Sequence, residues 1–94
     1  PDDPANLRQL GVAHHKVGNV LGNPNYPNLG DHAGALAEME QSVAVFARAA
    51  ARYPENAMFA RNLAVARSNV ADILTALGRR AEAAAQEQLA LETY

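Results

Sequence analysis

The chain has 94 residues, enough for one domain with a modest hydrophobic core. Hydrophobic residues make up 49% of it, many of them alanine, and aromatic residues only 5%, so the composition favours closely packed helices over a β-sheet. The net charge of −2 without a basic stripe argues against nucleic acid as a partner, and the absence of cysteine excludes disulfides and thiolate metal sites.

The first predicted helix begins at the N-terminus of the chain. Asp3 is a favoured N-cap residue, and Pro4 is favoured at the first helical position. Five residues then follow at spacings of three and four, which places them on one helical face: Leu7, Leu10, His14, Val17 and Leu21. The sequence Gly22-Asn23-Pro24 predicts the end of this helix.

The segment 22–31, GNPNYPNLGD, cannot be helical because two prolines and two glycines interrupt it. We expect Asp31 or His32 to cap a second helix over residues 33–52, about 30 Å long. Its predicted buried face repeats the spacing of the first helix: Leu36, Met39, Val43, Phe46, Ala50 and Tyr53.

Two further helices are predicted after Pro54. Asn56 can cap the third, and Gly78 suits the left-handed position beyond its end. The expected buried face of this helix is Leu63, Ala66, Val70, Ile73 or Leu74, and Leu77. The fourth helix, from 81 to about 91, has a thin apolar face of alanines with Leu89 and Leu91. Short turns between four helices predict antiparallel neighbours.

The sequence also repeats itself. LRQLGVAHHKVGNVL (7–21) aligns with ARNLAVARSNVADIL (60–74) at an offset of 53, and LGDHAGALA (29–37) aligns with LGRRAEAAA (77–85) at an offset of 48. The difference of five residues falls within the segment rich in asparagine and proline. We therefore expect this segment to be an insertion that decorates a turn at little cost in stability.

Several of the repeated residues resemble the tetratricopeptide pattern. The matching residues are Val17-Gly18-Asn19-Val20-Leu21, Gly30, Ala35, Met39 and Ser42 in the first repeat, and Val70, Ala71, Leu74, Gly78, Ala83 and Ala90 in the second. RNLAVARSNVADIL and GNPNYPNLGDHAGALAEM are similar to the long-period repeats that follow the kinase domain in some bacterial serine/threonine protein kinases. Three residues depart from the pattern, namely Glu87, His14 and Arg67; the first puts the packing of the last helix in doubt, and the others suggest partly wet rim positions.

The resemblance implies an all-α fold, a right-handed helical-repeat array of two antiparallel hairpins. Residues 1–94 then form a single domain, with repeat one over about 4–53, interrupted by the loop 22–30, and repeat two over about 56–94. We expect this domain to be a piece of a longer protein. The resemblance favours a cytoplasmic location, or an extracytoplasmic one if the chain belongs to a membrane-anchored kinase.

Neither a catalytic site nor a metal or cofactor site is expected. His14 and His15 point about 100° apart on a helix, and nothing places His32 near them, so a metal site is disfavoured against solvated histidines. No serine or threonine has the sequence context of an activated nucleophile, and the Gly-rich loop lacks the spacing and the lysine of a phosphate loop. An enzyme is therefore not predicted.

The resemblance implies a concave groove as the binding surface for a protein or peptide. Eight residues occupy the usual groove positions: Val12, His15, Asn19, Asn23, Val65, Ser68, Asp72 and Ala76. Because Asp72 would repel a carboxylate, no clamp for a peptide C-terminus is expected. The alternative is that these residues are simply the wet side of their helices.

Tyr26, between Asn25 and Pro27, is a possible contact residue of the loop. The favoured alternative is that Tyr26 folds back over the helix ends.

Two functions follow from these features. The first is a protein-interaction module that binds a partner segment in the groove, without direct membrane contact. The second is an assembly module, because two repeats are fewer than the three or so that usually seal such an array. In that case the open ends of the first and last helices, including Leu89 and Leu91, would contact neighbouring repeats or a second copy of the chain.

Overall fold

The computed structural model describes residues 3–93, which form four α-helices and contain no strand. They are α1 (Pro4–Gly22), α2 (His32–Arg52), α3 (Ala57–Ala76) and α4 (Arg80–Thr93). The predicted all-α fold with four helices is confirmed. The molecule is a flat slab with principal extents of 35 × 25 × 16 Å.

Side-chain caps start the first three helices. The Asp3 carboxylate accepts a hydrogen bond from the amide of Asn6, and Asp31 accepts one from Gly34. Asn56 accepts one from Met58. Each cap satisfies a backbone N–H that has no partner within its helix. All three helix starts lie within one residue of the prediction.

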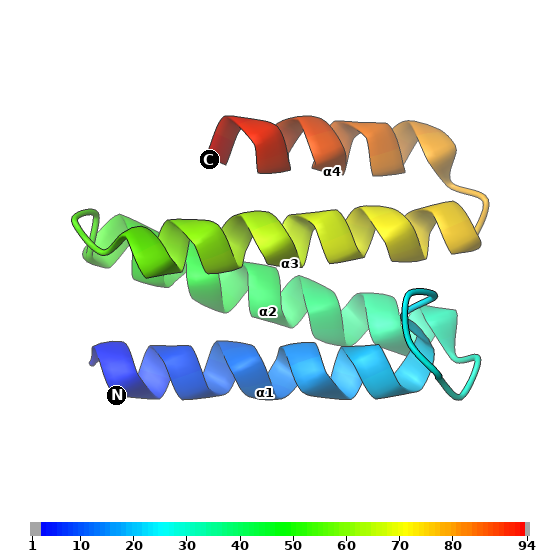
Figure 1. Ribbon diagram of the computed structural model, residues 1–94, viewed down its shortest axis with the longest axis horizontal. Helices are drawn as coiled ribbons and strands as arrows, with labels where there is room; N and C mark the ends of the chain where they lie inside the picture. Colours follow the sequence, from blue (N-terminus) through cyan, green and yellow to red (C-terminus); the bar gives the residue numbers. More distant parts are fainter. Residues whose placement is uncertain (1–2, 94) are drawn as a thin grey trace.

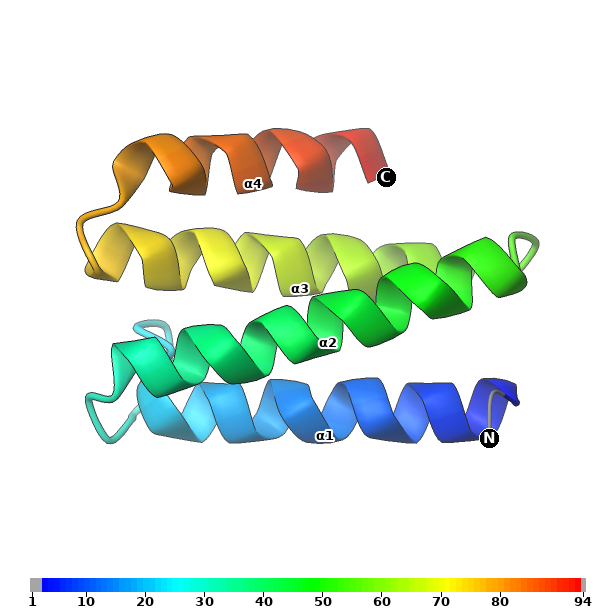
Figure 2. The same ribbon diagram turned by 180° about the vertical axis from the view of Figure 1, so that it is seen from behind.

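Each helix packs mainly against its neighbours in the chain. α2 contacts both α1 and α3, α3 also contacts α4, and α1 touches α3 only slightly. Figure 1 shows α1 and α3 in front of α2, and Figure 2, from behind, shows α2 nearest the viewer. α4 contacts α3 alone. The arrangement is therefore two consecutive helical hairpins joined through the packing of α2 on α3.

The buried core lies between the helices in two clusters. Near the inserted loop, residues of α2, α3 and α4 meet: Ala35, Leu36, Met39, Val70, Ala71, Ile73, Leu74 and Ala83. At the opposite end, residues of α1, α2 and α3 meet: Leu7, Val45, Phe46, Ala49, Phe59, Leu63 and Ala66. α2 and α3 both contribute to the two clusters, so these two helices form the centre of the fold.

The buried face of α1 differs from the predicted one. Its buried residues are Leu7, Gly11, Gly18 and Gly22, whereas Leu10 and Val17, expected in the core, are 44% and 46% exposed. The reason is the close approach of α2: a Cβ added at Gly11 would lie 2.5 Å from Cζ of Phe46. Apolar spacing alone could not reveal that the glycines face the core.

The two hairpin turns close in the same way. The amide of Asp31 donates to the carbonyl of Leu21, and the amide of Arg79 donates to the carbonyl of Leu74, both at 2.8 Å. These donors and acceptors are aligned with each other in the internal repeat. Gly30 and Gly78, also aligned, have φ of +80° and +79°, the left-handed conformation that glycine adopts without strain. The extra residues of the first turn therefore lie before Gly30, and the hydrogen bond and glycine conformation that close this turn are the same as in the second turn.

Leu77, expected on the buried face of α3, and Glu87, which departs from the repeat pattern in α4, are both exposed. Leu77 is the C-cap of α3 and is 37% exposed, so it does not extend the buried face as predicted. Glu87 is exposed, and α4 buries only Ala83 and Ala90. The expected weakness of α4 packing therefore has a physical basis in its small buried side chains.

Candidate functional site: the α1–α3 face and its loop

A network of asparagine side chains binds the inserted loop to the helices. Asn23, the C-cap of α1, is fully buried. Its side-chain Nδ2 donates to Oδ1 of Asn19 and to Oδ1 of Asn69, both at 2.8 Å. Its Oδ1 accepts a hydrogen bond from the amide of Asn25 at 3.0 Å. One buried side chain thus joins α1, α3 and the loop.

Further hydrogen bonds hold the rest of the loop. Asn25 Nδ2 donates to Asp72 Oδ2 at 2.6 Å, a second link to α3. Asn28 Nδ2 donates to the carbonyls of Asn23 and Tyr26, and its Oδ1 accepts from the amide of Gly30. Besides its place in the turn between α1 and α2, the loop therefore links the two hairpins, a contact that the sequence did not predict.

The loop lies on the side of the molecule where α1 and α3 are nearest the viewer in Figure 1. Together with the two helices it forms a surface that we call the α1–α3 face. To it we assign the helical residues that the repeat register predicts for a groove, namely Val12, His15 and Asn19 on α1, and Val65, Ser68, Asp72 and Ala76 on α3. The hydrogen-bond network brings Asn19, Asn23 and Asp72 together, the last through Asn25.

These residues differ in how accessible they are. Val65 is 42% exposed, and Ala76 is exposed as well. His15, Asn19, Ser68 and Asp72 are half-buried, and Val12 packs against the core cluster near Phe46. Asn23 is fully buried with both ends of its amide bonded, so it supports the face without being accessible on it.

Electrostatically, the face combines an acid with uncharged polar groups. The carboxylate of Asp72 accepts the hydrogen bond from Asn25. Burial lowers the pKa of His15, because removing the ring from water disfavours its charged form. His15 is therefore predominantly neutral at pH 7. A partner would meet apolar Val65, a neutral imidazole and one carboxylate.

Tyr26 stands at the tip of the loop. Its side chain is 52% exposed, so it does not fold back fully over the helix ends. Its amide donates to the carbonyl of Asn23 at 3.1 Å, and its own carbonyl accepts from Asn28. A hydrogen-bonded backbone thus presents a half-exposed aromatic ring to solvent.

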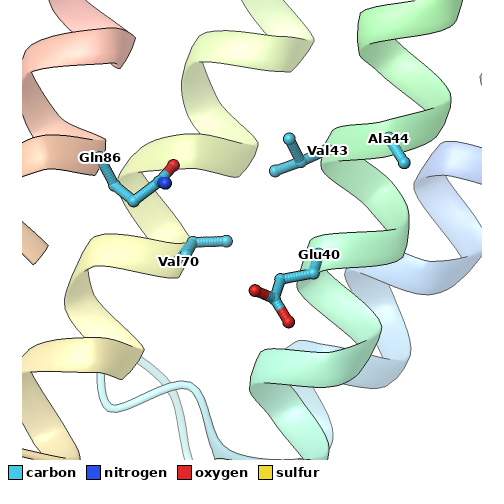
Figure 3. Close-up of a pocket in the computed structure, with 5 residues that line it drawn as sticks. All are labelled: Glu40, Val43, Ala44, Val70 and Gln86. Carbon is cyan, nitrogen blue, oxygen red and sulfur yellow. The ribbon is translucent and has the colours of Figure 1, made fainter. Parts of the chain in front are cut away.

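A separate cleft of about 260 Å³ lies between α2, α3 and α4. Figure 3 shows Val43 and Val70 beside it, with the polar ends of Glu40 and Gln86 and the methyl of Ala44. The backbones of α2 and α4 both pack closely on α3 but not on each other, and the cleft lies between them. None of the predicted groove residues lines this cleft, so it is distinct from the α1–α3 face.

The three histidines lie in different surroundings. Nδ1 of His14 is 3.0 Å from a carboxylate oxygen of Glu38, which pairs α1 with α2. Nδ1 of His32 donates to the carbonyl of Gly22 at 2.8 Å. Within residues 3–93, no group of three or more histidine, aspartate or glutamate side chains is placed to hold a metal ion. His14 is partly wet, as expected for a rim position, and half-buried Arg67 donates to Thr93 of α4.

The outward side of α1 is unexpectedly apolar. Four residues form what we call the outer stripe: Leu10, Ala13, Val17 and Val20. Their counterparts at the offset of 53 are Leu63, Ala66, Val70 and Ile73, all buried at 7% exposure or less. The three large residues of the outer stripe are 44–58% exposed. α3 is covered on this side by α2, whereas no helix within residues 3–93 covers α1 there.

Sequence reasoning missed three members of the asparagine network, namely Asn25, Asn28 and Asn69. A signal existed at Asn69, because asparagine is unfavourable inside a helix unless its side chain finds a partner. Comparisons with protein-family models, with curated proteins and with solved structures found no match. Within the described part of the chain, no helix combines the length and hydrophobicity needed to cross a membrane.

Proposed function

We propose that this domain is a non-catalytic protein–protein interaction module, and that the α1–α3 face with its loop binds a segment of a partner protein. The observation that carries the proposal is Tyr26. Its ring is half-exposed although the loop backbone around it is fixed by hydrogen bonds to Asn23 and Asn28. Aromatic side chains held rigidly at a surface contribute strongly to binding because little entropy is lost when they are covered.

The neighbouring residues define the chemistry of the expected segment. Val65 and Ala76 offer apolar contact, while Ser68 and Asp72 offer hydrogen-bond acceptors. A segment that fits carries an apolar side chain and amide or hydroxyl donors. A free C-terminal carboxylate is disfavoured beside Asp72.

The tetratricopeptide resemblance supports the same function. Residues such as Gly18, Ala35, Gly78 and Ala83 match that pattern, and proteins with it commonly bind peptide segments. A role in a bacterial signalling protein, next to a serine/threonine kinase domain, is the corresponding proposal for the longer protein. The aligned closing bonds of the two turns are consistent with a repeated unit.

A peptide-display selection against the immobilised chain tests the proposal. Peptides that bind the α1–α3 face should lose about tenfold or more in affinity to Tyr26→Ala, which removes the expected anchor. They should bind Leu91→Ala, changed at an exposed leucine of α4, as tightly as the wild type. Selected peptides that bind Tyr26→Ala and Val65→Ser with wild-type affinity would show that the face is not the binding surface.

A second function, assembly through the open ends of the array, is favoured by a different observation. The outer stripe of α1 is exposed, although its counterparts on α3 are buried. Exposed apolar surface of this kind marks contact sites. Covering Leu10, Val17 and Val20 would remove apolar area from water and stabilise an association.

A further inference from the structure

The far end of the molecule carries a second exposed site, on α4. The offset of 48 aligns Ala84 with Leu36, and Leu91 with Val43. Leu36 is 8% exposed, and Val43 packs against both core clusters where α2 meets α3. In contrast, Ala84 is exposed and Leu91 is 69% exposed. Leu36 and Val43 are positions at which α2 packs against α3. The aligned positions on α4 are exposed to solvent.

We propose that these two surfaces bind each other: the outer stripe of α1 in one copy of the chain packs on the Ala84–Leu91 side of α4 in a second copy. The contact would repeat between copies the packing of α3 on α2 within one chain (Figure 1). The proposal rests on the assembly function above and names its partner. It does not depend on peptide binding at the α1–α3 face.

The charges of the two helices are complementary. α1 contains Arg8 and Lys16 and no acidic residue, so its formal charge is +2. α4 contains one arginine and three glutamates, Glu82, Glu87 and Glu92, so its formal charge is 1 − 3 = −2. Opposite charges on facing helices favour the encounter and the orientation of two copies.

Lys16 has a more specific expected position. It aligns with Asn69, whose side chain bonds to Asn23 at the C-terminal end of α1. In the proposed contact, α1 of one copy packs on the α3–α4 hairpin of the other as α3 packs on the α1–α2 hairpin within one chain. Lys16 of the first copy would therefore lie at the C-terminal end of α3 of the second copy. The last turn of α3 contains no basic residue of its own. A lysine there would be favoured by the negative end of the helix dipole.

A symmetric pairing of two α1 helices fits these observations less well. It would bring together two helices that carry only positive charges, and it would leave Leu91 exposed. The head-to-tail contact covers both exposed ends. Because it is heterologous, it does not close at two copies and predicts growth into longer assemblies with rising concentration.

The experiment has two parts. The first is light scattering on a sizing column at chain concentrations from about 10 µM to about 1 mM. This range covers the dissociation constants expected for a contact smaller than a standard interface. The weight-average mass of the wild type should rise above the 10.0 kDa of one chain and pass twice that value without a plateau. Val17→Glu and Leu91→Glu should each remain monomeric with unchanged helical circular dichroism. Leu89→Glu is the matched control, because Leu89 is 40% exposed on the same helix but aligns with exposed Gln41.

The second part mixes the two interface variants. Val17→Glu retains an intact α4 surface, and Leu91→Glu retains an intact outer stripe. An equimolar mixture should therefore form a complex of one copy of each variant that grows no further, although neither variant associates alone.

Three results would overturn the proposal. If the wild-type chain is monomeric over the whole concentration range, a second copy does not bind these surfaces. If Leu91→Glu still associates with itself but forms no complex with Val17→Glu in the mixture, the contact is α1–α1 pairing instead. Loss of association in Leu89→Glu shows unspecific hydrophobic contact. Each of these results would leave Tyr26-dependent peptide binding intact, so failure here is distinguishable from failure of the peptide-binding function.

Discussion

In the α1–α2 hairpin a large side chain fills the space that a glycine leaves, with the ring of Phe46 against Gly11. In the α3–α4 hairpin the buried residues of the second helix are two alanines, Ala83 and Ala90. Both hairpins close their turns alike, yet the buried side chains of their second helices differ in size. The difference teaches that a repeated turn sets the topology, whereas the side chains between the helices set the stability of each unit.

The largest expected effect is that of Phe46→Ala. The ring is 2% exposed, and its loss leaves a cavity against Gly11, so the free energy of unfolding should fall by about 3–5 kcal/mol. Urea unfolding followed by circular dichroism measures it. Leu10→Ala, at a position 44% exposed, is the control and should change stability far less. Equal losses in both variants would contradict the assignment of Phe46 to the core and Leu10 to the surface.

Next in size is Asn23→Ala, which removes the link between the hairpins. The change leaves the amide of Asn25 and the acceptors on Asn19 and Asn69 without their partner, a loss of about 1–3 kcal/mol. Hydrogen exchange should also accelerate at the amides of residues 25–31. Asn6→Ala changes an asparagine whose side chain donates to the exposed Asp3 cap, and it serves as the control. Unchanged exchange in the loop would mean that the network does not hold it.

A smaller effect is expected for Ala90→Gly in α4. Glycine in place of alanine inside a helix lowers stability by about 1 kcal/mol. Because α4 contacts α3 alone, we expect faster hydrogen exchange within α4 and little change in the amides of α1 and α2. The aligned change Ser42→Gly should affect the whole domain, since the Ser42 hydroxyl donates to the carbonyl of Gly11. If Ala90→Gly also accelerated exchange in α1, the two hairpins would unfold as one unit.

The smallest effect concerns pH and His15 on α1. Burial lowers the pKa of His15 in the folded chain, so the unfolded chain binds a proton more readily. The contribution of neutral His15 to the free energy of unfolding is therefore fully present above the ordinary histidine pKa of about 6.5. It is lost as the pH decreases from there through the folded pKa. Urea unfolding at a series of pH values should show a weaker pH dependence in His15→Gln than in the wild type. Identical dependence in both chains would show that His15 titrates normally.

The helix ends were predictable from the sequence because they depend on local chemistry. Asp3, Asp31 and Asn56 cap helices through residues two or three positions away, and Gly78 follows a helix end that apolar spacing reveals. The aligned glycine Gly30 adopts the same conformation. Contacts of this range need no knowledge of the fold.

The orientation of α1 and the docking of the loop were not predictable in the same way. Spacing counts Leu10 and Val17 as core residues, but Gly11 and Gly18 admit α2 more closely, and the helix turns accordingly. Asn23 looked like a helix terminator, whereas its side chain bonds to Asn69, 46 positions later in the chain. Both features depend on which helices become neighbours in space.

Because the two turns close with the same geometry, the position just before the left-handed glycine of each turn can accept additional residues. Residues inserted before Gly30 leave the entry into α2 equivalent to the entry into α4 after Gly78. The α3–α4 turn, Thr75-Ala76-Leu77-Gly78, therefore offers a graft site: a foreign loop placed ahead of Gly78 should be displayed next to Ala76 without redirecting the following helix. A domain engineer could use that position to add a second recognition loop beside the natural one.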